Sequence, residues 1–305
     1  MHALWVDVNG QISTAEDATV SALDLGFTRG DSVFETLRIY RGVPFMWRAH
    51  HQRLIESARA VGIPMPPTGE LSARVDRLLD KGSGQDGVLR IQITAGLSER
   101  FAPMFDAIRP TVVIVLGAPP SQPAIDIRGR RAALSRIRRS DPQSLDPAIK
   151  SGSYLNCVLA ARDVQGRGYE EAIMLGPDGT VTEAASANVF AWYQNAWHTP
   201  IHGIFPGITR AWVLELCTAH GISAHEETVS LAQLHEAEEI VLTSSVRELT
   251  PIIELDDRRV GSGKVGPHTR ILDRHYQEML AASDSTPSGS TTDQIASQSS
   301  GTKVR

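Results

Sequence analysis

The chain has few of the residues that define several common classes of protein. Only two cysteines, Cys157 and Cys217, occur in 305 residues, too few for a disulfide framework or a cysteine metal cluster. Each lies in an apolar pattern of helical spacing, where a small buried thiol is the expected role. We therefore predict neither structural disulfides nor a metal site.

Charge and hydrophobicity make two kinds of partner improbable. The formal net charge of -5 and the isoelectric point near 6.1 leave no broad basic surface for nucleic acid. The locally basic segment 128–139 is interpreted as a solvated strand and linker in preference to an anion-binding patch. No leader of signal type and no run of membrane-spanning length is found. We predict a cytoplasmic protein that binds neither nucleic acid nor membranes.

Lysine is scarce, since the chain has only four lysines among its 30 lysine and arginine residues. Lys81 and Lys264 lie in glycine-rich segments and Lys303 lies in a polar tail, where solvated loops are expected. Lys150 instead precedes an apolar run of helical spacing, and we predict that it begins a helix. A merely solvated role there is unattractive because a positive charge opposes the helix dipole at an N-terminus. Lys150 is therefore the candidate catalytic lysine.

Other segments carry groups that complement such a lysine. Gly207-Ile208-Thr209 directly precedes a predicted helix, and N–H groups at a helix N-terminus suit a phosphate, although an ordinary N-cap is commoner. Glu183 follows a strand, where a carboxylate is otherwise a surface turn residue. Arg53, on an amphipathic helix, and Ser244-Ser245, after an apolar strand, add weaker support. An amine, a carboxylate and phosphate donors are what a pyridoxal-phosphate site requires.

Hydrophobic patterns predict a mixed α/β (α+β) chain with two domains. The predicted strands are 5–8, 11–12, 34–40, 43–46, 88–94, 111–116, 125–127, 132–134, 171–175, 181, 188–192, 197–199, 239–243 and 252–255. The predicted helices are 47–61, 72–79, one from 150, 209–220 and 269–281. The proline-rich segment 119–123 predicts an interdomain linker between a small domain, 1–118, and a larger cofactor-binding domain, 124–282. The polar tail 283–305 is predicted to be disordered.

A set of motifs in this chain resembles class IV aminotransferases, the fold-type IV pyridoxal-phosphate enzymes. This family includes branched-chain aminotransferases, D-amino-acid aminotransferases and aminodeoxychorismate lyases. The resemblance extends from about Leu25 to about Gln277. The motifs are Gly26–Arg38, His51–Leu54, Ile149-Lys150, Asp178-Gly179, Thr182-Glu183, Ala187–Phe190, Thr199-Pro200 and Pro206–Arg210.

The resemblance implies a fold and a reaction. The fold is a small N-terminal α/β domain and a larger C-terminal pseudo-barrel domain, with pyridoxal 5'-phosphate between them. The family forms homodimers in which a neighbouring subunit completes the active site. The implied reaction moves an amino group between an amino acid and a 2-oxo acid by a ping-pong mechanism.

The resemblance also implies roles for single residues. Lys150 matches the lysine that forms the Schiff base with the cofactor and moves the substrate α-proton. Glu183 matches the carboxylate beside the pyridine nitrogen. The residues that match phosphate-binding positions are Arg53, Ile208, Thr209 and Ser245, the last where the family usually has threonine.

The substrate-binding residues are predicted from one strand and several single positions. Period-two spacing places Phe34, Thr36 and Arg38 on one face of a strand, which in the family faces the substrate pocket. Two roles are open for Arg38, a two-pronged contact with a substrate carboxylate or a structural ion pair. The further candidates are Arg90, Arg100, Val246 and Arg247.

The choice of subfamily depends on departures from the common motifs. Val88 stands where branched-chain enzymes usually have a tyrosine that helps to hold the substrate carboxylate. The segment Leu97–Phe101 resembles the loop from which D-amino-acid aminotransferases present an arginine, here Arg100, although Ala102 replaces the usual histidine. Residues 151–156 also resemble the D-amino-acid and lyase branches. We favour a D-amino-acid-type transaminase; the alternatives are a branched-chain L-amino-acid aminotransferase, aminodeoxychorismate lyase releasing pyruvate, and a non-catalytic binding protein.

Overall fold

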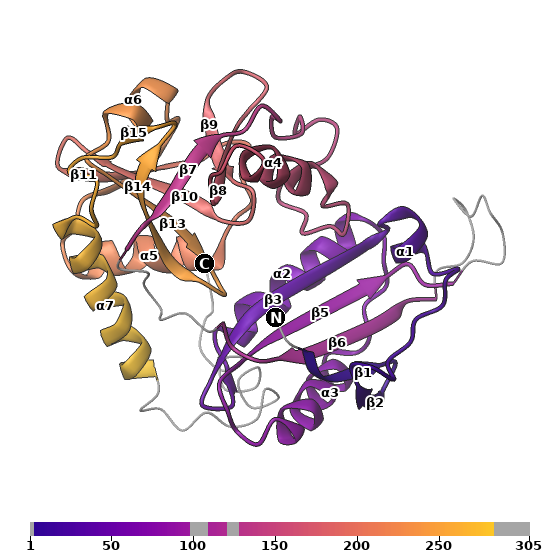
Figure 1. Ribbon diagram of the computed structural model, residues 1–305. Helices are drawn as coiled ribbons and strands as arrows, with labels where there is room; N and C mark the ends of the chain where they lie inside the picture. Colours follow the sequence, from indigo (N-terminus) through magenta and orange to yellow (C-terminus); the bar gives the residue numbers. More distant parts are fainter. Residues whose placement is uncertain (1–2, 98–108, 121–127, 284–305) are drawn as a thin grey trace, which may run out of the picture. The chain divides into compact units, whose positions relative to one another are not determined.

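The computed structural model describes residues 3–97, 109–120 and 128–283 (Figure 1). The chain divides into two compact units. In its described part, unit 1 consists of residues 3–97 and 109–120 together with Ile149–Ser153, and unit 2 of residues 128–148 and 154–283. Lys150 therefore belongs to unit 1, although the chain before and after its segment belongs to unit 2. The predicted strand 125–127, Arg100, and the tail beyond residue 283 lie outside the described residues.

Unit 1 is built on a six-stranded antiparallel sheet of order β2-β1-β6-β5-β3-β4 (Figure 1). Its strands are β1 Ala3–Val8, β2 Gln11–Thr14, β3 Ser32–Tyr40, β4 Val43–Pro44, β5 Gly87–Thr94 and β6 Thr111–Gly117. Its helices are α1 Leu25–Arg29, α2 Trp47–Ala60 and α3 Thr68–Lys81. Two predicted hairpins are confirmed. Each turns through a pair of residues with positive φ, Asn9-Gly10 and Arg41-Gly42, as tight hairpin turns require.

The alternation of β3 separates its two faces. Val33, Leu37 and Ile39 are completely buried in the core that β3, β5 and β6 form with α2 and α3. Because successive side chains of a strand point to opposite faces, Phe34, Thr36 and Arg38 lie on the face away from that core. Unit 1 therefore offers one sheet face, free of its own α2 and α3, on which polar chemistry can be built.

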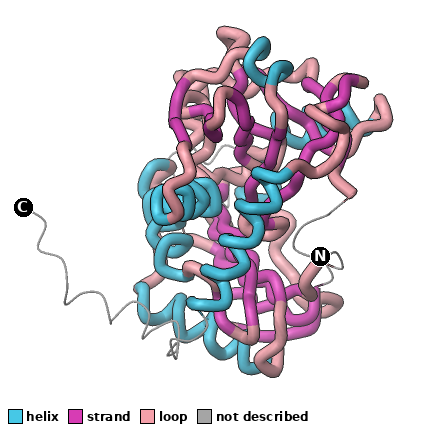
Figure 2. The backbone as a smooth tube through the Cα atoms, turned by 90° about the vertical axis from the view of Figure 1, so that its left-hand side faces the viewer, coloured by secondary structure: helices cyan, strands magenta, loops and turns pink. Residues whose placement is uncertain are grey.

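Unit 2 contains a nine-stranded mixed sheet of order β12-β11-β10-β13-β14-β7-β8-β9, with β15 paired to β14 (Figure 1). Figure 2 distinguishes the helices, strands and loops of the described residues by colour. The strands are β7 Arg130–Leu134, β8 Glu171–Leu175, β9 Val181–Ala184, β10 Asn188–Tyr193, β11 Ala196–Pro200, β12 Ala224–Glu227, β13 Glu239–Ser244, β14 Glu248–Leu255 and β15 Arg258–Arg259. The helices are α4 Leu155–Gln165, α5 Ile208–Ala219, α6 Leu231–Glu236 and α7 Pro267–Ser283. The terminal strand β9 also approaches β10, with a bridge between Ala184 and Ala187, so the sheet curls. This curled sheet agrees with the predicted pseudo-barrel.

The structure corrects one prediction near the candidate lysine. Helix α4 begins at Leu155, five residues after Lys150, so Lys150 does not begin a helix. Lys150 lies outside any helix, in a tight turn in which the N–H of Ser151 donates to the carbonyl oxygen of Ile149, so the argument from the helix dipole does not apply to it. The short elements α1, α6 and β12 were not predicted, because four to six residues carry too little periodicity. Among the described residues, no helix is both long and apolar enough to cross a membrane.

Candidate active site

Lys150 is held through its main chain by two elements of unit 1. Its carbonyl oxygen accepts a hydrogen bond of 3.0 Å from the N–H of Phe34 in β3. Its own N–H donates to Oγ of Ser57 in α2 at 3.2 Å. Both polar groups of the residue's backbone are thus satisfied by groups from a strand and a helix. The position of the lysine is therefore set by the packing of β3 on α2 and not by a helix of its own.

The segment that carries Lys150 occupies an open edge of β3. Strand β4 pairs only with the last two residues of β3, which leaves the earlier part of that edge available. Ser151 forms a bridge with Val33, and the N–H of Gly152 donates to the carbonyl oxygen of Ser32 at 2.6 Å. A Cβ at position 152 would lie 2.0 Å from Oγ of Ser32, so a side chain there would require that serine to move. The segment therefore extends the sheet of unit 1.

The side chains of Lys150 and Arg90 share one aromatic ring. Nζ of Lys150 lies 4.9 Å from the centroid of the Phe34 ring, and Cζ of Arg90 lies 4.0 Å from it. Both distances are within the range of cation–π attraction. Nη1 of Arg90 also donates to Oγ1 of Thr36 at 3.4 Å. On the strand face that the sequence predicted for substrate, Phe34 therefore contacts both a lysine and an arginine.

Arg38 continues this face toward the end of β3. It pairs in register with Val88 of β5, and its guanidinium lies 5.2 Å from the centroid of the Tyr40 ring. Its Nε and Nη1 atoms are buried and have no hydrogen-bond partner within the described part of the chain. Buried donors without acceptors are costly, so they favour an incoming anion. Of the two roles left open by the sequence, the carboxylate contact is the better supported.

On the core face of β3, Glu35 organises a buried cluster with α2. Its carboxylate accepts hydrogen bonds from Nε of Arg53 at 2.6 Å and from Nη2 at 2.9 Å, and contacts Nδ1 of His50 at 2.7 Å. Burial alone would raise the pKa of Glu35, but His50 and Arg53 lower this pKa to about 2. Burial lowers the pKa of His50, so its ring is neutral at pH 7 and donates to the carboxylate. The predicted phosphate ligand Arg53 is thus fixed by a carboxylate that sequence reasoning missed.

In unit 2, Glu183 is a buried carboxylate with three protein donors. Nε of Arg139 donates to Oε1 at 2.7 Å, and the N–H of Phe205 donates to Oε2 at 3.0 Å. Nδ2 of Asn188 lies 3.3 Å from the same Oε2. These donors stabilise the charged form of a carboxylate that is 5% exposed. Glu183 is therefore a prearranged negative charge, as a contact with a protonated pyridine nitrogen requires.

Asn188 connects Glu183 to the beginning of α5. The amide of Asn188 also donates to the carbonyl oxygen of Phe205 at 2.8 Å, in the loop before the helix. Gly207 is the N-cap, and a Cβ there would lie 1.9 Å from Oδ1 of Asn188. The first N–H groups of α5, including those of Ile208 and Thr209, have no acceptor within the helix. These free N–H groups suit an anionic phosphate, bound in the same unit as the Glu183 carboxylate.

The loop between β13 and β14 carries the remaining candidates of unit 2. Ser245 and Val246 are partly buried in this turn, and the N–H of Arg247 donates to Oγ of Ser244 at 3.3 Å. The guanidinium of Arg247 forms an ion pair with Glu171, with Nη2 to Oε2 at 3.2 Å. Arg247 is therefore engaged in a structural ion pair, whereas the roles of Ser245 and Val246 stay predictions.

The interpretation of segment 128–139 as solvated was wrong for two of its arginines. Arg130 pairs with Glu171 at 3.0 Å and Arg139 with Glu183 at 2.7 Å, both with largely buried side chains. Arg131, which pairs with Glu254, is exposed as expected. The segment itself contains six arginines and no acidic residue, which was a signal in the sequence that some of them pair with acids elsewhere in the fold.

The donor set fits pyridoxal 5'-phosphate. Unit 1 supplies a backbone-fixed lysine and the Arg53 guanidinium. Unit 2 supplies an ionised buried carboxylate and a helix N-terminus with a glycine N-cap. An amine, an anion for the ring nitrogen and donors for the phosphate are thus all present.

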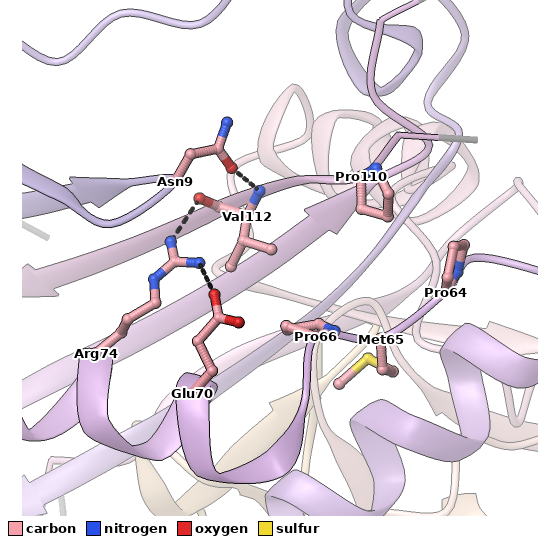
Figure 3. Close-up of a pocket in the computed structure, with 8 residues that line it drawn as sticks. All are labelled: Asn9, Pro64, Met65, Pro66, Glu70, Arg74, Pro110 and Val112. Carbon is pink, nitrogen blue, oxygen red and sulfur yellow. Dashed lines mark hydrogen bonds and ion pairs between the residues drawn. The ribbon is translucent and has the colours of Figure 1, made fainter. Parts of the chain in front are cut away.

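A cavity of about 250 Å³ elsewhere in unit 1 contains none of the predicted site residues (Figure 3). Three prolines, Met65 and the residues of a polar cluster line it. Figure 3 shows Arg74 directed at Glu70 and at the carbonyl oxygen of Val112, and Arg74 also pairs with the buried Asp7. The buried cation Arg74 is thus already paired with acidic residues, so we assign no chemistry to this cavity.

The chain belongs to the class IV aminotransferases, because the model of that family, amino-transferase class IV, matches residues 32–255. It is 33% identical over 277 residues to a putative branched-chain-amino-acid aminotransferase of Methanocaldococcus jannaschii, covering 89% of this chain and 95% of that protein. It is 33% identical over 275 residues to the D-alanine aminotransferase of Bacillus licheniformis, with the same coverage of 89% and 95%.

Solved structures agree with this assignment. The branched-chain amino acid aminotransferase of Thermobaculum terrenum in its PLP-form matches with a TM-score of 0.81 and 26% identity, over 92% of this chain and 94% of that chain. The predicted family, fold and enzyme class are thereby confirmed. The protein is an aminotransferase whose cofactor is pyridoxal 5'-phosphate.

Proposed function

We propose that this aminotransferase moves an amino group between a D-amino acid and a 2-oxo acid, with Lys150 as the catalytic residue. The observation that carries the proposal is the shared contact of Lys150 and Arg90 with Phe34. An α-amino acid has its amine and its carboxylate on one carbon atom. A cation that binds the carboxylate must therefore lie near the lysine that acts at that carbon, and Arg90 contacts the same Phe34 ring as Lys150.

The proposed roles follow from the position of each group. Bound pyridoxal 5'-phosphate would supply an aldehyde that reacts with amines and a ring that accepts electrons from the substrate. Nζ of Lys150 would take the proton from the substrate α-carbon and pass it on within the same half-reaction, and in the second half-reaction it would deliver a proton to the α-carbon of the new amino acid. Glu183 keeps the ring nitrogen protonated. Arg90, with Arg38, holds the substrate carboxylate, and Phe34, Thr36 and Val246 line the pocket.

We assign the phosphate to the four residues that the family resemblance implies. Ile208 and Thr209 contribute N–H groups of α5, because these donors have no acceptor within the helix. Arg53 contributes a guanidinium that Glu35 holds in one orientation. Ser245 contributes a hydroxyl group from the β13–β14 loop. These four residues are the phosphate-binding set of the proposal.

The D-amino-acid assignment is supported by residues and by relatives. Val88 leaves no hydroxyl group where branched-chain enzymes usually have tyrosine, and the segment after Lys150 resembles the D-amino-acid branch. The similarity to a D-alanine aminotransferase is as high as that to any other relative named above. A branched-chain L-amino-acid aminotransferase is the second candidate, favoured by the archaeal relative and by the structural neighbour.

We also propose that the protein is a homodimer, as the family resemblance implies, and that it acts in the cytoplasm. Phe27 is 78% exposed, Leu23 57% and Leu97 53%, all at or beside α1 in unit 1. Exposed apolar side chains that lie together are typical of a protein interface. Light scattering on the purified protein tests this point, and a monomer at micromolar concentration would contradict it.

A half-reaction screen tests the proposed substrate. The holoenzyme is mixed with single amino acids, D-alanine, D-glutamate, L-leucine and L-isoleucine, and conversion to pyridoxamine phosphate is followed by absorbance. We expect fast conversion by the D-amino acids. Fast conversion by L-leucine with D-alanine inert would establish the branched-chain alternative instead. Pyruvate release from aminodeoxychorismate without added 2-oxo acid would identify a lyase.

A further inference from the structure

We propose that Arg210 is a positioning residue that aims the first N–H groups of α5 at the cofactor phosphate. The inference rests on the proposed role of Ile208 and Thr209 in binding that phosphate. Arg210 is the third residue of α5, directly after those two. It acts through them and needs no contact with the cofactor.

Arg210 fastens the first turn of α5 to two strands. Its Nε donates to Oγ1 of Thr199 at 3.0 Å, and its Nη2 donates to the carbonyl oxygen of Pro200 at 2.9 Å, both at the end of β11. Nη2 also pairs with Oε1 of Glu226 in β12 at 2.8 Å. Arg210 is 7% exposed and Thr199 is completely buried. The guanidinium is therefore a buried clamp with partners of three chemical kinds.

The direction of the clamp follows from helix geometry. Side chains in a helix lean toward its N-terminus, so a residue in the first turn reaches past the helix start. Arg210 uses this direction to reach β11, which lies between β10 and β12 in the sheet. On β10, Asn188 packs against Gly207, where even a Cβ would collide. The start of α5 is thus held at two points, and rotation of its N–H groups is restricted.

A role in merely attaching the helix does not explain this arginine. Trp212, Val213, Leu216 and Cys217 are already buried on the inner face of α5 and attach the helix body. Burial of a guanidinium is expensive, and an apolar side chain would attach the turn at lower cost. A cation in the first turn also opposes the helix dipole. A phosphate dianion at the helix start changes this balance, because the dianion is attracted both by the positive end of the helix dipole and by the charge of Arg210.

The test compares two ligands that differ only in the phosphate. The full-length protein is freed of cofactor, and its affinities for pyridoxal 5'-phosphate and for pyridoxal are measured by fluorescence titration. For Arg210→Met we expect about tenfold weaker binding of pyridoxal 5'-phosphate, because charge-assisted hydrogen bonds lose alignment. Binding of pyridoxal should not change. Arg210→Lys keeps the charge but not the planar set of donors, so its affinity for pyridoxal 5'-phosphate should lie between those of the wild type and of Arg210→Met.

Arg167→Met is the matched control. Arg167 also holds a carbonyl oxygen, that of Leu134 at 2.6 Å, and a carboxylate, that of Asp163 at 3.3 Å, but joins β7 to α4. The Arg167→Met variant should keep the wild-type ratio of affinity for pyridoxal 5'-phosphate to affinity for pyridoxal. If Arg210→Met weakens both ligands equally, or neither, the positioning role is wrong.

Two further variants keep the outcome clear. Thr199→Val preserves the shape of the side chain and removes one hydrogen-bond partner of Arg210. It should therefore lower the affinity for pyridoxal 5'-phosphate relative to that for pyridoxal, and it provides this test even if Arg210→Met does not fold. The inference would be overturned if Thr199→Val and a folded Arg210→Lys both kept the wild-type ratio of affinity for pyridoxal 5'-phosphate to affinity for pyridoxal. Ile208→Pro tests the premise, because it removes one of the N–H groups assigned to the phosphate and proline is tolerated at the first position of a helix. If that variant keeps full phosphate selectivity, the phosphate is bound elsewhere and the proposed site fails with the inference.

Discussion

Nζ of Lys150 lies 4.9 Å from the centroid of the Phe34 ring, and the N–H of Phe34 donates to the carbonyl oxygen of Lys150. One residue thus places both the backbone and the side chain of the candidate catalytic lysine. The same ring is in contact with Arg90. The reactive amine and the proposed carboxylate-binding cation are therefore positioned by a single residue of β3.

Replacement of Lys150 should abolish transamination. For Lys150→Ala we expect a loss of roughly 10³-fold or more in rate, because no other amine moves the α-proton. Borohydride reduction of the wild-type holoenzyme should label the tryptic peptide that contains Lys150, as detected by mass spectrometry. Lys264→Ala is the control and should retain activity and labelling. A label on another lysine, or none at Lys150, would contradict the assignment.

Removal of the Arg90 guanidinium should weaken recognition of the substrate carboxylate. For Arg90→Met we expect kcat/KM for D-alanine to fall roughly 10-fold to 100-fold, the cost of lost hydrogen bonds to a charged group. The preference for D-alanine over D-alaninol, which lacks the carboxylate, should fall by the same factor. Steady-state kinetics with both compounds measure this. An unchanged preference would show that another cation binds the carboxylate, and Arg38→Met is then the next variant.

Glu183→Gln should impair the chemical step while preserving the shape of the side chain. The loss of a prearranged charge beside the ring nitrogen should lower kcat by about 10²-fold to 10³-fold. Glu171→Gln is the control, because Glu171 is also a buried acid of unit 2 held by arginines. The control is expected to lower the melting temperature with a much smaller effect on kcat. Equal effects on kcat in the two variants would mean that Glu183 is structural.

The buried Glu35 cluster predicts loss of stability in acid. The pKa of Glu35 in the fold, about 2, lies below its ordinary value of 4.5, so the ionised group stabilises the fold above pH 4.5. This contribution disappears as the pH falls from 4.5 to about 2. The pKa of His50 is also lowered, so the unfolded chain gains a proton first as the pH falls through 6.5. Both groups therefore destabilise the fold in acid.

Denaturant unfolding at several pH values measures this effect. Glu35→Gln should be less stable than wild type at pH 7 by about 3–5 kcal/mol, because Arg53 loses its buried partner. The difference should narrow below pH 4.5. Glu70→Gln, at a side chain that is 57% exposed, is the control and should change little at any pH. A difference that stays constant from pH 7 to pH 2.5 would contradict the assigned pKa.

The sequence predicted most of the regular elements because their signals are local. Alternation predicted β3 and the face that Phe34, Thr36 and Arg38 share, and Asn9-Gly10 predicted the first hairpin. The helix expected from Lys150 was wrong because the apolar spacing belongs to α4, while the preceding residues pair with β3. A sequence pattern does not show that an unpaired strand edge is available elsewhere in the chain.

By itself, the sequence determined which groups can do the chemistry: a singular lysine, a carboxylate, a glycine before a helix, and motifs sufficient for the family. These depend on residue type and spacing over a few positions. Only the tertiary structure decided the partners of those groups. Glu35 meets Arg53 across 18 residues and Glu183 meets Arg139 across 44. Such contacts arise from the packing of strands and helices that are distant in the chain, and local periodicity contains no information about them.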